Sequence, residues 1–242
     1  VWSLSKKEWG ILVGASVFLA LHLITWIASV QLTTVANATI IFSINPVITA
    51  VLGYLILSEP VTRKLIVSII LGLTGVVIAG WEDISLGSAI EKNRLLGDVS
   101  SIFCAFFASG YFLMGKRIMQ KLDTHVYVAF AYTIAAVFCF TVLAFLGLPL
   151  TQYSAQTWLC FGLMAIIPTV IGHTMLNRSI RIFGASKVST ATMSEPPMAA
   201  LVAFFAWSEP IGPHVFLGYL FIVASVVFLV LDIKKTSEPQ VR

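Results

Sequence analysis

Two polar residues stand directly before prolines inside long apolar stretches: Asn45 precedes Pro46, and Glu195 precedes Pro196. Glu195 lies about ten residues into an apolar segment of about twenty-two, where a charged carboxylate is unfavourable and is a functional candidate by default. A carboxyl group at that depth can exchange a proton or bind a substrate amine, whereas the Asn45 amide can bind a polar substrate without changing its charge. In the alternative interpretation, both side chains only satisfy backbone carbonyls that each proline leaves without a partner.

Two further pairs of polar residues have the spacing of one helix face. His173 and Asn177 are four residues apart, as are His22 and Trp26 in another apolar segment, and residues at this spacing are neighbours on a helix surface. These side chains can line a cavity from two sides. Alternatively, the histidines form interhelical hydrogen bonds within the packing, and Asn177, next to Arg178, serves the membrane interface.

Tyr111 and Tyr132 also lie inside apolar segments and can present hydroxyl groups to a cavity, although packing with one hydrogen bond is the alternative role.

The three cysteines have no Cys-x-x-Cys or metal-ligand spacing, so we interpret them as packing residues. The sequence has no phosphate-binding glycine loop, nucleophile elbow or His/Asp metal cluster. We therefore expect neither an enzyme nor a cofactor or metal site.

The composition indicates an integral membrane protein. Of the 242 residues, 58% are hydrophobic and 11% are charged, and the mean hydropathy is +0.95, whereas soluble domains are about a quarter charged. A membrane helix needs about 20 apolar residues, and eight segments come close to or exceed that length: 9–30, 35–57, 64–81, 96–115, 125–147, 156–177, 186–207 and 212–232. The basic residues lie in the short loops between them, which predicts membrane lipid and not nucleic acid as the surrounding partner.

Lysine and arginine predict the orientation of these helices, because cytoplasmic loops of membrane proteins carry an excess of both. With the N-terminus in the cytoplasm, all of the 15 basic residues except Lys92 and Arg94 fall on the cytoplasmic side. The two exceptions are accompanied by Glu82, Asp83 and Glu91. We therefore expect a multi-pass protein whose two chain ends are both cytoplasmic.

The two proline sites belong to an internal repeat with an offset of about 150 residues. Residues 58–60 and 208–210 both read Ser-Glu-Pro, in which serine and glutamate are expected to begin the next helix. Segment 35–57 is expected to run from outside to inside and segment 186–207 from inside to outside. The repeat is therefore inverted, as in many transporters.

The inversion predicts the domain organisation. Residues 1–82 would hold the last three helices of a first unit, and residues 95–233 would hold a complete second unit of five helices. An inverted repeat requires an odd number of helices in each unit, and the second unit has five whereas the first has only three, so we expect two further helices before Val1. The predicted fold is an all-α polytopic membrane protein with eight transmembrane helices of an expected ten.

Residues 36–80 resemble the second half of an EamA domain, and residues 96–231 resemble a whole one. The features that carry the resemblance are Pro46, Ser58-Glu59, Gly72/Gly75, Gly172-His173-Thr174-x-x-Asn177 and Glu195-Pro196. The resemblance to the EamA family of the drug/metabolite transporter superfamily implies a ten-helix bacterial inner-membrane exporter of amino acids or related metabolites, built from two inverted five-helix units.

We expect a carrier that moves a small polar metabolite by alternating access, with its site between the two units near the bilayer midplane. Glu195 would couple transport to protons or bind a substrate amine, and Asn45, His173, His22 and Trp26 would line the site beside it. One alternative is an uncoupled facilitator or exchanger of the same fold. The other is a non-transporting membrane subunit or a truncated fragment.

Overall fold

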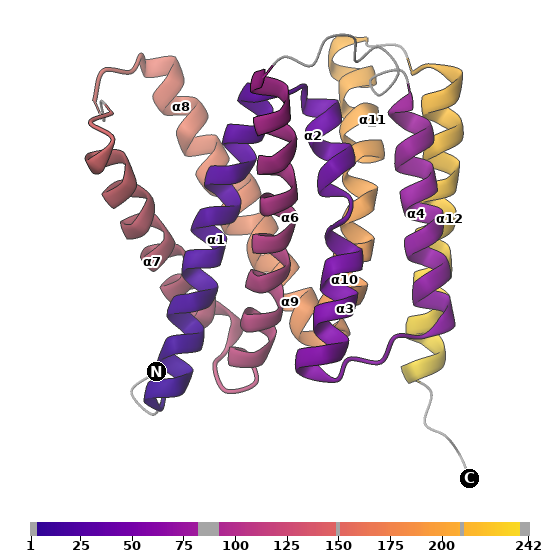
Figure 1. Cartoon of the computed structure of the whole chain (residues 1–242), viewed down its shortest axis with the longest axis horizontal. Coiled ribbons are helices and arrows are strands. Elements are labelled where there is room, and N and C mark those ends of the chain that lie inside the picture. The colour runs from indigo at the N-terminus through magenta and orange to yellow at the C-terminus, as the bar shows by residue number, and fades with distance from the viewer. Residues whose placement is uncertain (1–3, 82–91, 149–150, 209–210, 238–242) are drawn as a thin grey trace.

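The computed structural model describes residues 4–81, 92–148, 151–208 and 211–237, and within these ranges all regular secondary structure is helical (Figure 1). The elements are α1 (Lys6–Leu32), α2 (Val35–Phe42), α3 (Asn45–Leu57), α4 (Arg63–Ala79), α6 (Lys92–Ile118), α7 (Thr124–Phe145), α8 (Ala155–Met164), the π-helix η1 (Ala165–His173), α9 (Thr174–Phe183), α10 (Ala185–Ala191), the 3₁₀ turn η2 (Thr192–Ser194), α11 (Glu195–Trp207) and α12 (Pro213–Ser237). Side-chain caps stabilise the starts of several helices. Ser5, Thr34, Thr62, Asp123 and Ser154 each accept a backbone N–H bond in the first turn.

These helices make the chain an integral multi-pass membrane protein. Six helical stretches in the described ranges are long and apolar enough to cross a bilayer: Lys6–Leu32, Asn37–Leu57, Arg94–Ile118, Thr124–Phe145, Ala155–Phe183 and Pro213–Leu231. The other two expected segments are helical as well. α4 has 17 residues, and α10, η2 and α11 follow one another without a gap. The predicted all-helical polytopic fold is confirmed.

The two proline sites interrupt two helices at equivalent positions. α3 begins at Asn45 and α11 begins at Glu195, and both helices have 13 residues. The residue that follows each helix has a left-handed φ, 54° at Ser58 and 55° at Ser208. In Figure 1, α2 lies above α3 whereas α10 lies below α11, so the two broken helices run in opposite directions. The other predicted members of the second Ser-Glu-Pro, Glu209 and Pro210, lie outside the described residues.

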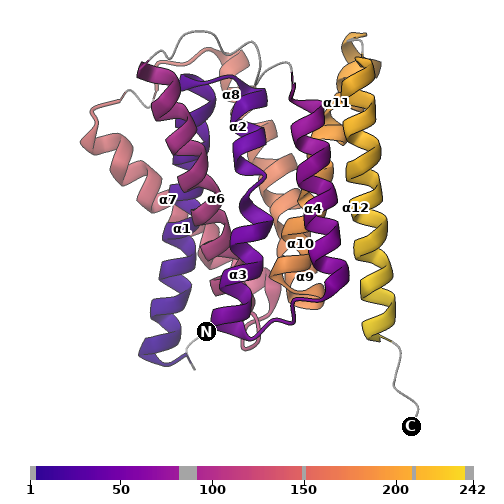
Figure 2. The same ribbon diagram turned by 45° about the vertical axis from the view of Figure 1, so that its right-hand side comes forward.

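The bundle has two ends that differ in charge. We call the end at which α1, α4 and α10 begin the basic end, because it carries Lys6, Lys64, Lys116 and Arg181. The end at which α2 begins is the opposite end. Between them, α1 packs against α6 and α7, α4 packs against α12, and α3 lies between α6 and α10 (Figures 1 and 2).

The helices differ in how far the protein covers them. The largest buried cluster joins α1, α6 and α7 and includes Leu12, Tyr111 and Tyr127. By contrast, α8 and η1 contain no buried residue. Their side chains therefore face the surroundings of the described bundle, which in a membrane protein are lipid or further membrane-embedded helices.

The pair α4 and α12 is in backbone contact. A Cβ atom on Gly75 would lie 2.5 Å from the carbonyl oxygen of Gly218, and a Cβ atom on Gly218 would lie 2.5 Å from the carbonyl oxygen of Gly75. Nearby, the Ser225 hydroxyl donates to the Ser68 carbonyl at 2.7 Å. Glycines that let two backbones approach are a common basis of packing between membrane helices. The two helices consequently form one closely packed pair.

Replacement of Gly75 by alanine tests this contact. The added methyl group would overlap the Gly218 carbonyl oxygen, so we expect the free energy of unfolding to fall by about 1–3 kcal/mol. Gly162→Ala is the matched control, because no atom lies within 4 Å of a Cβ there and alanine favours a helix over glycine. Unfolding in mixed micelles with increasing dodecyl sulfate, followed by circular dichroism, measures both variants. Equal stability of the two would contradict the contact.

Candidate functional site

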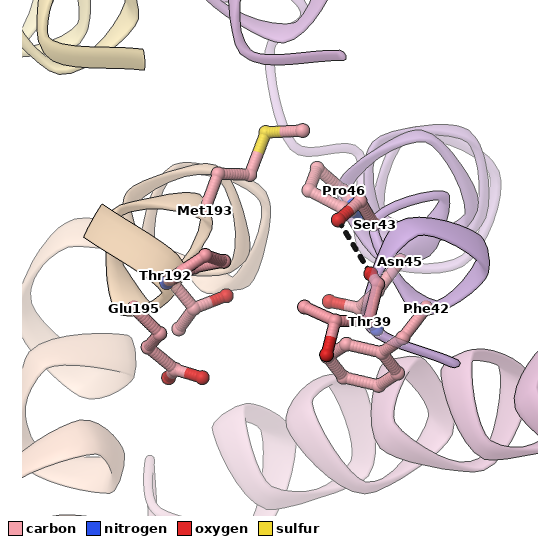
Figure 3. Close-up of a pocket in the computed structure, with 9 residues that line it drawn as sticks. Thr39, Phe42, Ser43, Asn45, Pro46, Thr192, Met193 and Glu195 are labelled. Atoms are coloured by element: carbon pink, nitrogen blue, oxygen red, sulfur yellow. Dashed lines mark hydrogen bonds between the residues drawn. The ribbon is translucent and has the colours of Figure 1, made fainter. Parts of the chain in front are cut away.

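A pocket lies between the two broken helices (Figure 3). Its lining comes from α2 and α3 on one side and from η2 and α11 on the other: Thr39, Phe42, Ser43, Asn45, Pro46, Thr192, Met193, Glu195 and Pro196. Side chains of the two helices face one another across it in Figure 3. Both proline sites therefore open onto the same space, at the contact between the two halves of the repeat.

The Asn45 amide joins α3 to α6. Its Nδ2 donates to the Ala105 carbonyl and to the Ser109 hydroxyl, each at 2.9 Å, and Thr49 Oγ1 donates to the same hydroxyl oxygen at 2.9 Å. The Asn45 side chain is 1% exposed, and its Oδ1 has no hydrogen-bond partner. Asn45 thus holds two helices together, does not repair the break at Pro46, and keeps one acceptor unused beside the pocket.

The Glu195 residue is exposed and lines the pocket (Figure 3). Within the described ranges, its carboxyl group has no hydrogen bond or ion pair. Other groups stabilise the interrupted helix: Ser194 Oγ donates to the Ala191 carbonyl at 2.7 Å, and the Glu195 N–H donates to the Thr192 carbonyl. The carboxyl group is therefore not needed to repair the break and is available to a ligand.

His22 and Trp26 stand behind the pocket and do not line it. The ring of Phe42, which does line it, has its centroid 5.8 Å from that of His22 and 5.9 Å from that of Trp26. Nδ1 of His22 also lies 3.2 Å from both the carbonyl oxygen and Sγ of Cys104 on α6. These two residues therefore support the aromatic wall of the pocket and join α1 to its neighbours.

The other sequence-predicted residues form a polar cluster among α6, α7, η1 and α9. Asn177 Nδ2 donates to the Tyr111 hydroxyl at 2.5 Å and to the His173 carbonyl at 2.7 Å. The rings of Tyr111 and His173 lie 6.3 Å apart, and the Tyr132 hydroxyl is 3.3 Å from Thr174 Oγ1. None of these residues belongs to the pocket lining. The structure thus places the eight predicted residues in two groups.

The polar cluster has unused hydrogen-bonding capacity. Tyr127, which sequence reasoning missed, stacks on Tyr111 with ring centroids 6.5 Å apart, and both are 0% exposed. The Tyr127 hydroxyl, Nδ1 of His173 and Oδ1 of Asn177 are buried without a partner. Buried polar atoms are normally satisfied by protein or by ordered water, so this cluster is suited to hold water molecules.

Besides Pro46 and Pro196, five pocket residues were not among the predicted site residues: Thr39, Phe42, Ser43, Thr192 and Met193. Helical spacing would have indicated several of them. Thr39 and Phe42, Phe42 and Asn45, and Thr192 and Glu195 are each three residues apart, and residues at this spacing are neighbours on a helix surface.

The expected role of the first Ser-Glu-Pro is wrong. α4 begins at Arg63 with Thr62 as its cap, and Ser58 ends α3. Glu59 instead contacts Lys116 on α6 and the start of α10. Burial raises the pKa of Glu59, but the bonds from Lys116 and from Ser186 and Ala185 on α10 outweigh it and hold the pKa below its ordinary value. Glu59 is therefore an ionised residue that connects distant parts of the chain.

Replacement of Asn45 by alanine tests its structural role. The change removes both bonds to α6, so we expect the free energy of unfolding to fall by about 1–2 kcal/mol. Ser43→Ala is the control, because the Ser43 hydroxyl donates only to the Thr39 carbonyl of its own helix, and we expect a change below about 0.5 kcal/mol. Thermal unfolding in detergent measures both. A loss no larger for Asn45→Ala than for Ser43→Ala would contradict the helix-joining role.

Comparison with known proteins identifies relatives over most of the chain. Residues 1–81 and 95–231 match the model of the EamA-like transporter family. The "Uncharacterized transporter YyaM" of Bacillus subtilis is 26% identical over 201 residues, which are 81% of this chain and 64% of the relative. An uncharacterized transporter of Clostridium kluyveri is 24% identical over 212 residues, 87% of this chain and 68% of the relative. The chain therefore spans about two thirds of the length of these relatives.

A solved crystal structure has the same fold. It superposes with a TM-score of 0.78 over 95% of this chain and 79% of that chain, at 16% sequence identity. At this identity, the likeness concerns the arrangement of helices and not their chemistry.

Proposed function

Because the chain belongs to the EamA-like transporter family, we propose that it is a secondary transporter that moves a small polar metabolite, such as an amino acid or a related compound, by alternating access. The observation that carries the proposal is the pocket between the two oppositely directed broken helices, with Asn45 on one and Glu195 on the other. Substrate and coupling-ion sites of carriers with inverted repeats lie at such interrupted helices.

Glu195 is the proposed coupling residue. Its carboxyl group is exposed to the pocket and has no bonding partner in the described ranges, so it can take up or release a proton without breaking a contact within the protein. Asn45, at the same position of the other half, cannot titrate. An inverted pair with one ionisable member offers one proton site for each transport cycle.

The proposal places the protein in a bacterial inner membrane with the basic end in the cytoplasm, as the excess of lysine and arginine favours. It includes the two helices expected before Val1. These would cover the exposed face of α8 and η1 in the way that α6 and α7 cover α1. Membership of a transporter family supports a carrier over an enzyme.

Replacement of Glu195 by glutamine tests coupling. Proteoliposomes are screened with a panel of radiolabelled amino acids and related metabolites, with and without a proton gradient. We expect the gradient to stimulate uptake by the unsubstituted protein and to have no effect on Glu195→Gln, because an amide cannot bind the proton. Glu8→Gln, which removes a carboxylate at the basic end, away from the pocket, should retain the stimulation.

The outcomes separate the alternatives. Uptake that never responds to the gradient indicates an uncoupled facilitator or exchanger. A gradient response that survives in Glu195→Gln contradicts the coupling role of Glu195. Absence of both flux and ligand-dependent stabilisation for the whole panel indicates a non-transporting membrane subunit.

A further inference from the structure

The donor hydrogens of the polar side chains in the pocket are all engaged in hydrogen bonds within the protein. The hydroxyls of Thr39, Ser43 and Thr192 donate to carbonyls of their own helices at 2.7, 2.8 and 2.8 Å. Both Nδ2 hydrogens of Asn45 are donated to α6, which leaves Oδ1 without a partner. The Glu195 carboxyl oxygens are unpartnered in the described ranges. The pocket thus presents acceptor oxygens to a ligand.

We infer that the pocket selects substrates by a protonated amino group; this inference rests on the proposed function and specifies its substrate class. An ammonium group supplies three hydrogen-bond donors for these oxygens. It also supplies the positive charge that would pair with an ionised Glu195. The ring of Phe42, backed by Trp26, adds an aromatic face that attracts a cation. None of the nine lining residues is basic, so the pocket has no side chain to pair with a substrate carboxylate.

Three probes of equal size test the selectivity: propylammonium, propionate and 1-propanol. Each is titrated into the detergent-solubilised protein at constant ionic strength, and the unfolding temperature is measured. We expect a saturable rise with propylammonium alone, which Glu195→Gln abolishes. Thr141→Val should retain the rise, because the Thr141 hydroxyl bonds its own helix on α7, away from the pocket.

Several results would overturn the inference. They are no rise with propylammonium, an equal rise with propionate, or a rise that survives in Glu195→Gln. The measurement needs no flux. Binding of propylammonium without transport of any compound would therefore contradict only the proposed function. Transport of a substrate that has no amino group would contradict only the inferred selectivity.

A second inference comes from the basic end, where Glu59 joins the two halves of the repeat. Its Oε1 accepts from Lys116 Nζ at 2.6 Å and from the Ala185 N–H at 3.0 Å. Its Oε2 accepts from the Ser186 hydroxyl at 2.5 Å and from the Ser186 N–H at 3.1 Å. Glu59 is 6% exposed. One carboxylate from the first half therefore binds two helices of the second.

The helices α3 and α10 pack closely against each other next to this carboxylate. A Cβ atom on Gly53 would lie 2.9 Å from Ser186 Oγ and 3.2 Å from Glu59 Oε2. Thr49 and Ser189, which lie between this contact and the pocket, are each 0% exposed. The described structure thus has no opening from the pocket to the basic end along these residues.

We propose that Glu59 is the latch of the basic end, and that its release from Lys116 and α10 opens the pocket to that side during transport. Charge-assisted hydrogen bonds are about twice as strong as neutral ones, and four of them meet on this one group. The ion pair between Glu8 and Lys121 at the same end is a useful contrast, because the Lys121 side chain is 63% exposed and exposed pairs contribute little.

A cysteine at position 189 reports on the latch. Ser189→Cys is introduced after Cys104, Cys139 and Cys160 are replaced by alanine, and an impermeant thiol reagent is added at the basic end of reconstituted protein. We expect Glu59→Gln to raise the labelling rate about tenfold or more, the factor that corresponds to one lost charge-assisted bond. Glu8→Gln should leave the rate unchanged.

Lys116→Met is the second variant, because it removes the ion pair and keeps the bonds to α10; we expect a smaller rise. Monodispersity by size-exclusion chromatography confirms folding of each variant. Unchanged labelling in both Glu59→Gln and Lys116→Met, or an equal rise in Glu8→Gln, would overturn the latch. Labelling does not depend on flux, so the latch and the proposed function can fail separately.

Discussion

Backbone groups that lose their helical partner inside a bilayer have to be satisfied by the protein itself, and this constraint determines where the two proline sites can stand. At the second break, the Thr192 carbonyl, whose usual donor would be residue 196, accepts from the Glu195 N–H instead, and the Ser194 hydroxyl donates to the Ala191 carbonyl. Both irregular stretches face the same pocket. Neither the Asn45 nor the Glu195 side chain takes part in backbone repair, so both are available for other contacts.

The equivalence of the two breaks does not extend to the environments of these side chains. Asn45 is buried and hydrogen-bonded to α6, whereas Glu195 is exposed to the pocket. The same backbone geometry therefore places one side chain in the helix packing and leaves the other unpartnered at the pocket. Duplicated folds can diverge in this way because the backbone of each half is stabilised independently of the side chain at its centre.

Local patterns predicted most of the architecture. Hydropathy and length identified the helices, and Pro46 and Pro196 indicated that two of them are interrupted, although not the residues at which α3 and α11 begin. These properties depend on neighbours in sequence, such as the missing N–H of proline. The repeat and the distribution of basic residues together predicted that the two broken helices run in opposite directions.

Long-range partners were beyond the same reasoning. Ser-Glu-Pro has the local pattern of a helix start, yet Glu59 finds its donors at Lys116 and Ser186, 57 and 127 residues away. Likewise, Tyr111 and Asn177 meet only because α6 and α9 pack together. A single sequence specifies which residues need partners, and tertiary packing decides which partners they obtain.

The backbone contact between Gly75 and Gly218 has a mechanical consequence. With no side chain between them, α4 and α12 cannot slide or tilt past each other without an overlap of atoms. The two helices therefore form one rigid pair at the side of the bundle (Figure 2). Under the proposed alternating access, we expect bending at the two interrupted helices, where the regular hydrogen bonding of the helix is broken, and not in this pair.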